Sequence, residues 1–219
     1  MDWIDLTQTL WEGSDRAGRT RPPSFTQLQT VEHDHFSMME YTFVSHIGTH
    51  IDAPNHFLSG AGGADEIALE RVVGSGVVLE ASVPALIAIT DMRLAAGGPE
   101  PRPGDIVLLR TGWEEKMGTA DYMRHPYLDV SACRWLVEHQ VSLVGMDLIT
   151  PEQPEASRTG PFDWPAHHAL MDNGVLVMEN VCNMATLVRR RVEVVAAPIP
   201  IRGGDGAPVR VIARPVGSP

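Results

Sequence analysis

Cysteine, basic charge and long apolar runs are all scarce in this sequence. Cys133 and Cys182 are the only cysteines among 219 residues, so they make no disulfide framework, and their apolar surroundings favour buried free thiols in a reducing compartment. The 17 basic residues are outnumbered by 28 acidic ones, and the formal net charge of −11 disfavours nucleic acid and anionic membranes as partners. The most apolar stretch, residues 76–89, contains Glu80 and Pro84 and is too short to span a bilayer.

Targeting features are missing as well. The segment Met1–Asp5 has neither the basic region nor the apolar region of a secretory signal, so we expect a cytoplasmic protein. Hydrophobic residues make up 43% and charged residues 21% of the chain, which is typical of globular proteins. The length suits one sizeable core, and no internal repeat is apparent. The sequence therefore predicts a single domain over residues 1–219.

One short stretch, between Ser45 and Phe57, carries most of the recognisable chemistry. His46, His50, Asp52 and His56 all fall at even positions within it. In an extended backbone, side chains two or four residues apart point to the same face, so these four groups would converge on one patch. Three histidines and an aspartate at this spacing are typical of a metal or catalytic site.

The residues around this stretch favour a strand that ends in a loop. Tyr41–Val44, immediately before it, is aromatic and β-branched, and Pro54 disfavours a helical conformation at Ala53. Gly48 permits a turn or a close approach of another backbone. In a helix, only His46 and His50 would share a face cleanly.

Periodicity and turn residues predict an alternation of strands and helices. The apolar strands at 106–110 and 141–147 are separated by the clearest helix, at 129–140, which suggests a parallel pair with a crossover. Asp129 or Ser131 would cap this helix, and Asp163 would cap the helix that follows. Further strands are predicted at 3–7, 27–33, 35–44, 76–81, 175–180, 192–199 and 209–213, and further helices at 65–73, 90–96, 163–171 and 184–190. His33 and His35 lie at the predicted turn between two strands and are interpreted as solvated.

Two later positions are candidates to complete the site. Glu179 ends an apolar strand, where a carboxylate is costly to bury unless it is paired or bound to a cation. His167 and His168 lie on the preceding helix, and the spacing leaves open which of them approaches Glu179. Imidazole and carboxylate ligands without cysteine suit zinc, manganese or iron(II), and the set could hold one metal or two.

These residues resemble the signature of the metal-dependent cyclase family, which includes bacterial kynurenine formamidases and isatin hydrolases. The resemblance covers nearly the whole chain and is most specific in the run 46–56. It continues in Arg110–Trp113, Gly145–Asp147, His167–Leu170 and Glu179–Asn180.

The resemblance implies a fold and a role for each site residue. The fold is a mixed β-barrel flanked by helices, a swivelling β/β/α arrangement of the α/β class, in a chain that forms dimers or tetramers. The divalent metal is Zn²⁺ or Mn²⁺, one or two per subunit, and Asp52 bridges when two are present. His56 corresponds to the catalytic acid/base. The metal ligands implied by the resemblance are His46, His50, Asp52, His167 and Glu179, with His167 chosen over His168 because it keeps the family's interval to the glutamate.

The first long loop departs from the family pattern. Formamidases of the family carry Trp-Pro-Gly-Asp there, with the tryptophan lining the substrate pocket, whereas this chain has Arg16–Arg19 and its nearest tryptophan is Trp11. Trp11 is therefore the candidate substrate-binding residue. Residues 11–25 could cover a pocket or form a solvent-exposed loop, and the sequence favours neither.

The predicted function is hydrolysis of a small amide, formamide or lactam, with an aromatic group expected in the substrate. A metal-bound hydroxide would attack the carbonyl and His56 would protonate the departing nitrogen. Hydrolysis of isatin or of another cyclic amide or lactone is the near alternative. A metal-dependent cyclase or dehydratase is a second one, and a non-catalytic metal-binding module is least favoured, since a structural site needs no additional base.

Overall fold

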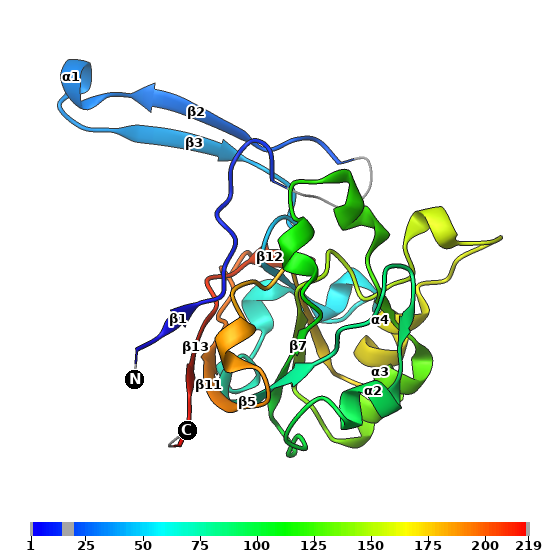
Figure 1. Ribbon diagram of the computed structural model, residues 1–219. Helices are drawn as coiled ribbons and strands as arrows, with labels where there is room; N and C mark the ends of the chain where they lie inside the picture. Colours follow the sequence, from blue (N-terminus) through cyan, green and yellow to red (C-terminus); the bar gives the residue numbers. More distant parts are fainter. Residues whose placement is uncertain (1, 15–19, 218–219) are drawn as a thin grey trace.

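A curled sheet of nine strands forms the centre of the computed structural model, which describes residues 2–14 and 20–217 (Figure 1). The strand order is β1-β13-β11-β5-β7-β9-β10-β4-β12. The bounds are β1 Ile4–Asp5, β4 His50–Asp52, β5 Val73–Glu80, β7 Ile106–Arg110, β9 Leu143–Met146, β10 Leu176–Glu179, β11 Arg191–Val195, β12 Gly206–Pro208 and β13 Ile212–Pro215. Strands β5, β7, β9 and β10 run parallel to their neighbours in this group, and the strands outside them pair antiparallel.

Both faces of the sheet are buried, as continuous apolar strands require. Successive residues of β5 show the division, because Val77 and Leu79 pack in one core whereas Val78 packs in the other. The first core is completed by the helices α2 (Asp91–Ala95), α3 (Val130–Glu138) and α4 (Pro165–Met171), which lie together on one side of the sheet (Figure 1). The α/β fold with a mixed, barrel-like sheet flanked by helices is confirmed.

Local sequence signals account for α2 and α3. The Asp129 carboxylate accepts a hydrogen bond from the Ala132 backbone N–H at 2.9 Å, and the Thr90 hydroxyl caps α2 in the same way. The predicted parallel pair with a helical crossover is confirmed by β7 and β9. The predicted cap of α4 is wrong, since Trp164 rather than Asp163 occupies the N-cap position and no side chain caps that helix.

Two predicted helices are absent from the described chain. Residues 65–73 form two separate 3₁₀ turns, Ala64–Glu66 and Leu69–Arg71, because Ile67 and Ala68 between them are extended. The predicted helix at 184–190 is a single 3₁₀ turn, Ala185–Leu187, after which the backbone becomes extended. In both segments the apolar spacing suited a helix, but the chain buries its apolar residues without one.

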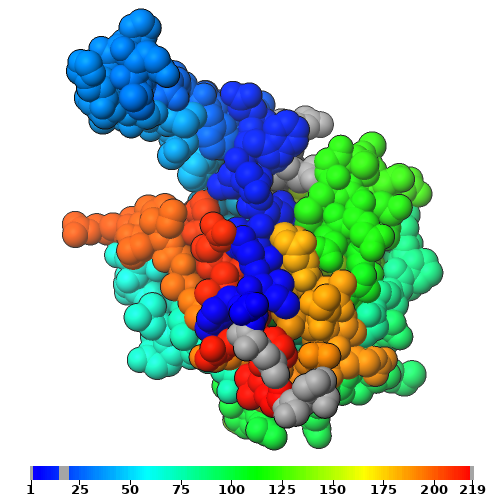
Figure 2. All heavy atoms as spheres, turned by 60° about the vertical axis from the view of Figure 1, so that its left-hand side comes forward, coloured from blue at the N-terminus to red at the C-terminus, as the bar shows by residue number. Residues whose placement is uncertain are grey.

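A two-stranded hairpin projects from the body (Figures 1 and 2). It consists of β2 (Ser24–Gln29) and β3 (Met38–Thr42), which pair antiparallel with an irregularity near Gln27. The two strands are confirmed, but the predicted tight turn is replaced by the short helix α1 (Val31–Asp34). Two further short strands, β6 (Ala88–Ile89) and β8 (Tyr127–Leu128), pair parallel. Among the described residues, no helix combines the length and the hydropathy that crossing a membrane would require.

Candidate metal centre and active site

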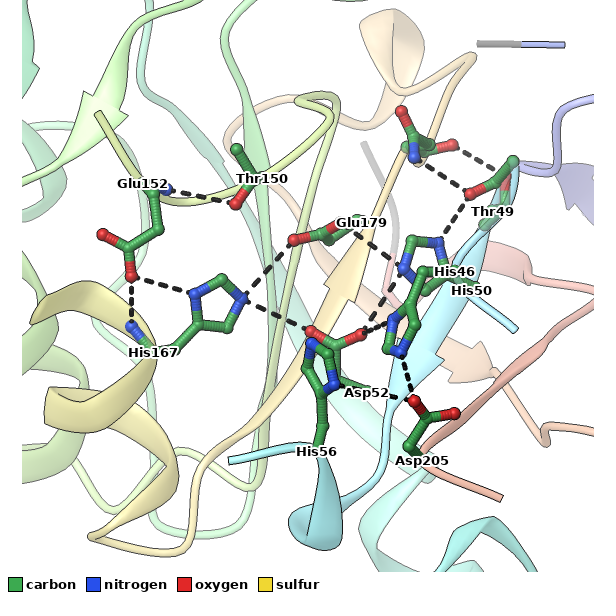
Figure 3. Close-up of polar contacts among 12 residues, drawn as sticks. His46, Thr49, His50, Asp52, His56, Thr150, Glu152, His167, Glu179 and Asp205 are labelled. Carbon is green, nitrogen blue, oxygen red and sulfur yellow. Dashed lines mark hydrogen bonds and ion pairs between the residues drawn. The ribbon is translucent and has the colours of Figure 1, made fainter. Parts of the chain in front are cut away.

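The candidate site lies where β4 is held between β10 and β12. The register places Glu179 of β10 opposite His50 and Gly206 of β12 opposite Asp52. Because residues of antiparallel neighbours that lie opposite each other project to the same face, the pairing brings a carboxylate from residue 179 to an imidazole from residue 50. The His50 Nε2 atom lies 3.4 Å from the Glu179 Oε2 atom (Figure 3).

Only part of the 46–56 stretch is a strand. His50 and Asp52 share a face of β4 as alternation predicts, but His56 lies in the 3₁₀ turn Pro54–His56. His46 precedes the strand, and Gly48 between them has φ of 54°, in the left-handed region that glycine adopts without strain. The turn at Gly48 brings His46 Nδ1 to 2.7 Å from Asp52 Oδ1.

Asn180 and Thr49 fasten this turn to the end of β10. The Asn180 Nδ2 atom donates to the Gly48 carbonyl at 3.0 Å, and the Thr49 hydroxyl donates to the Asn180 carbonyl at 2.7 Å. The Tyr122 hydroxyl in turn donates to Asn180 Oδ1. These bonds are buried, so the loop that carries His46 has a fixed shape.

His167 reaches the same cluster from α4. Its Nε2 atom lies 3.4 Å from Asp52 Oδ2 and 3.6 Å from Glu179 Oε1. His168, the alternative, is directed away to Asp172 and is exposed. On the other side of the His167 ring, Glu152 Oε1 accepts hydrogen bonds from His167 Nδ1 at 2.9 Å and from its backbone N–H at 2.8 Å (Figure 3).

The five residues His46, His50, Asp52, His167 and Glu179, hereafter the ligand cluster, have the composition of a divalent-metal site. Two groups within it, His46–His50–Asp52 and Asp52–His167–Glu179, each bring three ligand atoms to within 4.8 Å of one another, and Asp52 belongs to both. The His50 Nδ1 atom donates to the Gly48 carbonyl, which leaves Nε2 as the atom that faces the carboxylates. This buried Nε2 makes no hydrogen bond to a described group, so the cluster fits a cation.

The charges of the cluster are balanced only by protons in the absence of a cation. Burial lowers the pKa of His50, but the adjacent Asp52 and Glu179 carboxylates outweigh burial and raise the pKa to about 9. Burial likewise opposes protonation of His167, whose pKa is nevertheless raised well above its ordinary value by Asp52, Glu152 and Glu179. A divalent cation would take over the charge of these protons, and its binding would release them.

His56 differs from the ligand cluster in charge and contacts. Its ring stacks on His46, with centroids 4.0 Å apart, and its Nδ1 atom lies 3.9 Å from Asp205 Oδ2. Burial lowers the pKa of His56 to about 4, since the charge of Asp52 does not compensate for it. His56 is therefore neutral at pH 7 and able to accept a proton. A third possible metal group, His46–His56–Asp205, involves it as well.

The ligand cluster opens into a cavity of about 440 Å³. Thr20, Phe57, Thr150 and Trp164 line it together with His46, Asp52, His56, His167 and Glu179. Trp11, the predicted substrate-binding residue, is 61% exposed and lines a separate cavity beside Cys182 and Asn183. The structure therefore does not bring Trp11 to the cluster within this chain, and Arg16–Arg19 lie outside the described residues.

Sequence reasoning missed Trp164, Phe57 and Glu152. The Phe57 ring stacks on His167 with centroids 4.3 Å apart, and the Trp164 ring lies 6.2 Å from Phe57 and 6.4 Å from His167. Phe57 follows His56 directly, and Trp164 lies three residues before His167, so proximity to predicted site residues was the available signal. Glu152 lies in the acidic loop that follows Asp147, and no sequence motif marks it. That loop is structural as well, because Asp147 is buried and accepts backbone N–H groups from Thr111 and Gly112.

The curled α/β fold and the His–Asp–Glu cluster define the protein as a metal-dependent hydrolase. Residues 4–153 match the model of the family described as "Putative cyclase". The chain belongs to this cyclase family.

Known proteins resemble the chain over most of its length. It is 28% identical over 217 residues to the kynurenine formamidase of Geobacillus thermodenitrificans, which covers 98% of both chains. It is 31% identical over 185 residues to the kynurenine formamidase of Bordetella petrii, which covers 83% of this chain and 82% of that protein. Among solved structures, isatin hydrolase A from Ralstonia solanacearum superposes with a TM-score of 0.86 at 26% identity, over 97% of this chain and 91% of that one.

Proposed function

We propose that the protein hydrolyses the carbon–nitrogen bond of a small aromatic amide, formamide or lactam, as a kynurenine formamidase does. The observation that carries the proposal is the position of a neutral His56 beside the ligand cluster, at the wall of a cavity that also presents aromatic rings. The similarity to formamidases in sequence and to isatin hydrolase A in structure supports the same class of reaction.

His46, His50, Asp52, His167 and Glu179 would hold the metal. When bound, a divalent cation polarises a carbonyl oxygen and lowers the pKa of water. Two of these side chains have second partners that fix their orientation, the Gly48 carbonyl at His50 and the Glu152 carboxylate at His167. Asp52, which belongs to both three-residue groups, would bridge if two ions bind.

His56 would carry the proton. As a neutral imidazole it accepts a proton from the attacking water, and as an imidazolium it then donates that proton to the departing nitrogen. The charge of Asp52 favours the imidazolium form, while burial keeps it short-lived.

Phe57 and Trp164 would orient the substrate. Their rings lie 6.2 Å apart at the cavity wall, and both contact His167. An aryl group packed on these rings leaves its amide substituent near the ligand cluster and excludes water from that side. The alternative substrate, a cyclic amide of the isatin type, uses the same walls and is favoured by the TM-score of 0.86 to isatin hydrolase A.

Hydrolysis and metal dependence are tested together. Purified protein is stripped with a chelator, reloaded with Zn²⁺ or Mn²⁺, and assayed on N-formylkynurenine, isatin and simple aryl esters, with metal content measured on the same samples. We expect turnover of an amide or lactam only after reloading. Turnover of esters alone, or equal turnover by stripped and reloaded protein, contradicts the proposal.

Three finer features complete the proposal. Zn²⁺ or Mn²⁺ suits the imidazole–carboxylate ligand set, with one or two ions per subunit. A homodimer or homotetramer is supported by the hairpin, which exposes the apolar side chains of Leu28, Phe36, Met38, Met39 and Tyr41. A cytoplasmic location is supported by the two buried free thiols, Cys133 and Cys182.

A further inference from the structure

A second cavity adjoins the one that contains the ligand cluster. Thr150 and Trp164 line both, so the two spaces share a wall. The second cavity measures about 650 Å³. Its remaining lining residues are Met123, His125, Ile149, Pro154, Glu155, Ala156 and Arg158, and the cavity is hereafter called the Arg158 cavity.

The guanidinium of Arg158 is held in place by stacking rather than by an ion pair. Its Cζ atom lies 3.9 Å from the centre of the Phe162 ring and 4.8 Å from that of Trp164, and its Nε atom donates to the Gln153 carbonyl at 2.7 Å. No carboxylate among residues 2–14 and 20–217 forms an ion pair with Arg158. The edge of the guanidinium beyond Nε therefore presents a fixed positive charge without a counter-ion in the described part of the chain.

Trp164 connects this charge to the reaction centre. Its ring centre lies 6.4 Å from that of His167, on one side, and 4.8 Å from Arg158 Cζ, on the other. Its backbone has φ of 56° and ψ of 54°, a left-handed conformation that is uncommon for a bulky residue. Such conformations persist where the surroundings hold them and concentrate at binding sites. The indole is thereby fixed between the two cavities.

His125 supplies a neutral polar group to the same cavity. It is 1% exposed, and its Nδ1 atom donates to the Pro126 carbonyl at 2.8 Å, which leaves Nε2 without a proton in the neutral ring. Burial, together with the charge of Arg158, lowers the pKa of His125 to about 4, although the hydrogen bond to the Pro126 carbonyl opposes both. At pH 7 the cationic charge of this cavity therefore comes from Arg158 alone among its lining residues.

We propose that the Arg158 cavity is the subsite for a carboxylate of the substrate, so that the enzyme selects aryl amides bearing a carboxylate on a side chain remote from the scissile bond. The substrate's ring would pack on Trp164, with its amide at the ligand cluster and its carboxylate at the guanidinium. A planar guanidinium matches a carboxylate with two parallel hydrogen bonds. This assignment rests on the proposed amide hydrolysis, and it favours amino-acid-bearing formamides over isatin, which has no carboxylate.

Glu155 is the one carboxylate that lines the Arg158 cavity. Its side chain is exposed and makes no ion pair with Arg158. A solvated carboxylate interacts weakly with a charge on a bound ligand, whereas the stacked guanidinium is partly shielded from water. Glu155 therefore weakens the binding of an anion slightly. Removing its charge should strengthen the binding of the substrate carboxylate slightly, which is the opposite of the effect expected at Arg158.

The test compares two formamides that differ by one charge. The first is N-formylkynurenine and the second is its primary carboxamide, which keeps the α-ammonium group but carries an uncharged amide in place of the carboxylate. We expect Arg158→Gln to lower about tenfold the kcat/KM of the carboxylate substrate divided by that of the carboxamide. The change should come mainly from a higher KM for the carboxylate substrate, because a charge-assisted hydrogen bond is lost. Arg158→Lys should restore part of the ratio. Glu155→Gln should shift it slightly in the opposite direction, and Arg134→Gln, at an exposed site on α3, serves as the matched control.

Two outcomes overturn the subsite while leaving the hydrolase in place. One is an equal loss of kcat/KM on both formamides in Arg158→Gln, which would show that the arginine only packs against Trp164. The other is a kcat/KM on both formamides that Arg158→Gln leaves unchanged. If the wild type hydrolyses neither formamide, calorimetry with the unreactive carboxylate benzoylpropionate still decides the subsite. The proposed function itself fails only if the reloaded wild type does not hydrolyse isatin either. Binding that weakens about tenfold in Arg158→Gln supports it, whereas equal binding by the two proteins, or no binding to the wild type, overturns it.

Discussion

The ligand cluster and the Arg158 cavity share a wall, but the chain builds them from different material. Three of the cluster residues, His50, Asp52 and Glu179, lie on paired strands, where the register decides which side chains face each other. The Arg158 cavity is instead lined by segments outside the nine-stranded sheet.

The two sites differ in how many atoms must be held in fixed positions. A metal site needs several atoms fixed at once, which strands and buried second partners provide. A subsite that selects among substrates needs one or two contacts and can be changed without disturbing the sheet. The comparison therefore predicts that substitutions in the cluster abolish function, whereas substitutions around the second cavity alter selectivity or acid stability.

The largest effect is expected at Asp52, which belongs to both three-residue groups of the cluster. Asp52→Asn removes a buried charge that His46, His50 and His167 all contact, so we expect loss of bound metal and a fall in kcat/KM of about a thousandfold or more. Metal content by mass spectrometry and turnover are measured on the same sample. Asp172→Asn is the control, because its 51% exposed side chain pairs with His168 and lies outside the ligand cluster. Full metal content in Asp52→Asn contradicts the assignment.

His56→Ala is expected to separate proton transfer from metal binding. The variant should retain its metal and lose about a hundredfold to ten-thousandfold in kcat, since His56 lies outside the ligand cluster but beside it. The matched control is His33→Ala, which removes an exposed histidine on α1, in the hairpin that projects from the body. Wild-type kcat in His56→Ala would remove the acid/base role, and loss of metal would make His56 a ligand.

Glu152→Gln should have an intermediate effect. The glutamine oxygen can still accept from His167, but the negative charge that supports this imidazole is gone. We expect metal affinity to fall about tenfold, in line with partners of metal-ligating histidines. Competition with a chelator of known affinity measures the change. Glu155→Gln, three residues further along the chain and exposed, should leave metal affinity as it is. Equal affinities in wild type and Glu152→Gln contradict the supporting role.

The smallest effect at neutral pH is expected at His125 in the second cavity. Its pKa is lowered to about 4 in the folded chain, against 6.5 when exposed, so the unfolded chain binds a proton that the folded chain does not between these values. The free energy of unfolding should therefore fall as the pH drops from 6.5 to 4, by up to about 3 kcal/mol from this group. Urea unfolding at several pH values measures it.

The control for this prediction is a difference between two proteins. His125→Gln lacks the titrating group, so the gap between its unfolding free energy and that of the wild type should shrink as the pH falls. Other histidines titrate equally in both proteins and cancel. A gap that is independent of pH would show that His125 is charged, or accessible to protons, in the folded state.

Much of the fold follows from local sequence. The strands β5, β7, β9 and β10 are apolar runs, and α3 has both an apolar face and an aspartate cap. Prediction failed where apolar spacing resembled a helix without one forming, as at 65–73. In this segment Ile67 packs against the core, and two short 3₁₀ turns allow this packing as well as a helix would.

Only part of the candidate site could be predicted from the local sequence. Alternation brought together His50 and Asp52, which do share a face of β4, but His46 and His56 reach the cluster through a turn at Gly48 and a 3₁₀ turn. The choice of His167 over His168 rested on resemblance rather than on spacing. In the structure the helix places one ring in the cluster and the next in solvent, because neighbouring residues point about 100° apart.

The sequence by itself determined the chemistry of this protein, since the donor types and their close spacing in residues 46–56 already imply a divalent cation and a proton carrier. Only the tertiary structure decided what surrounds that chemistry. Trp164 and Arg158 carry no motif, and the fold places Trp164 at the wall of the cluster's cavity with Arg158 stacked on its ring. The physical reason is that the type of a side chain alone decides whether it can bind a metal or transfer a proton. The wall of a cavity depends instead on contacts between segments that are distant along the chain.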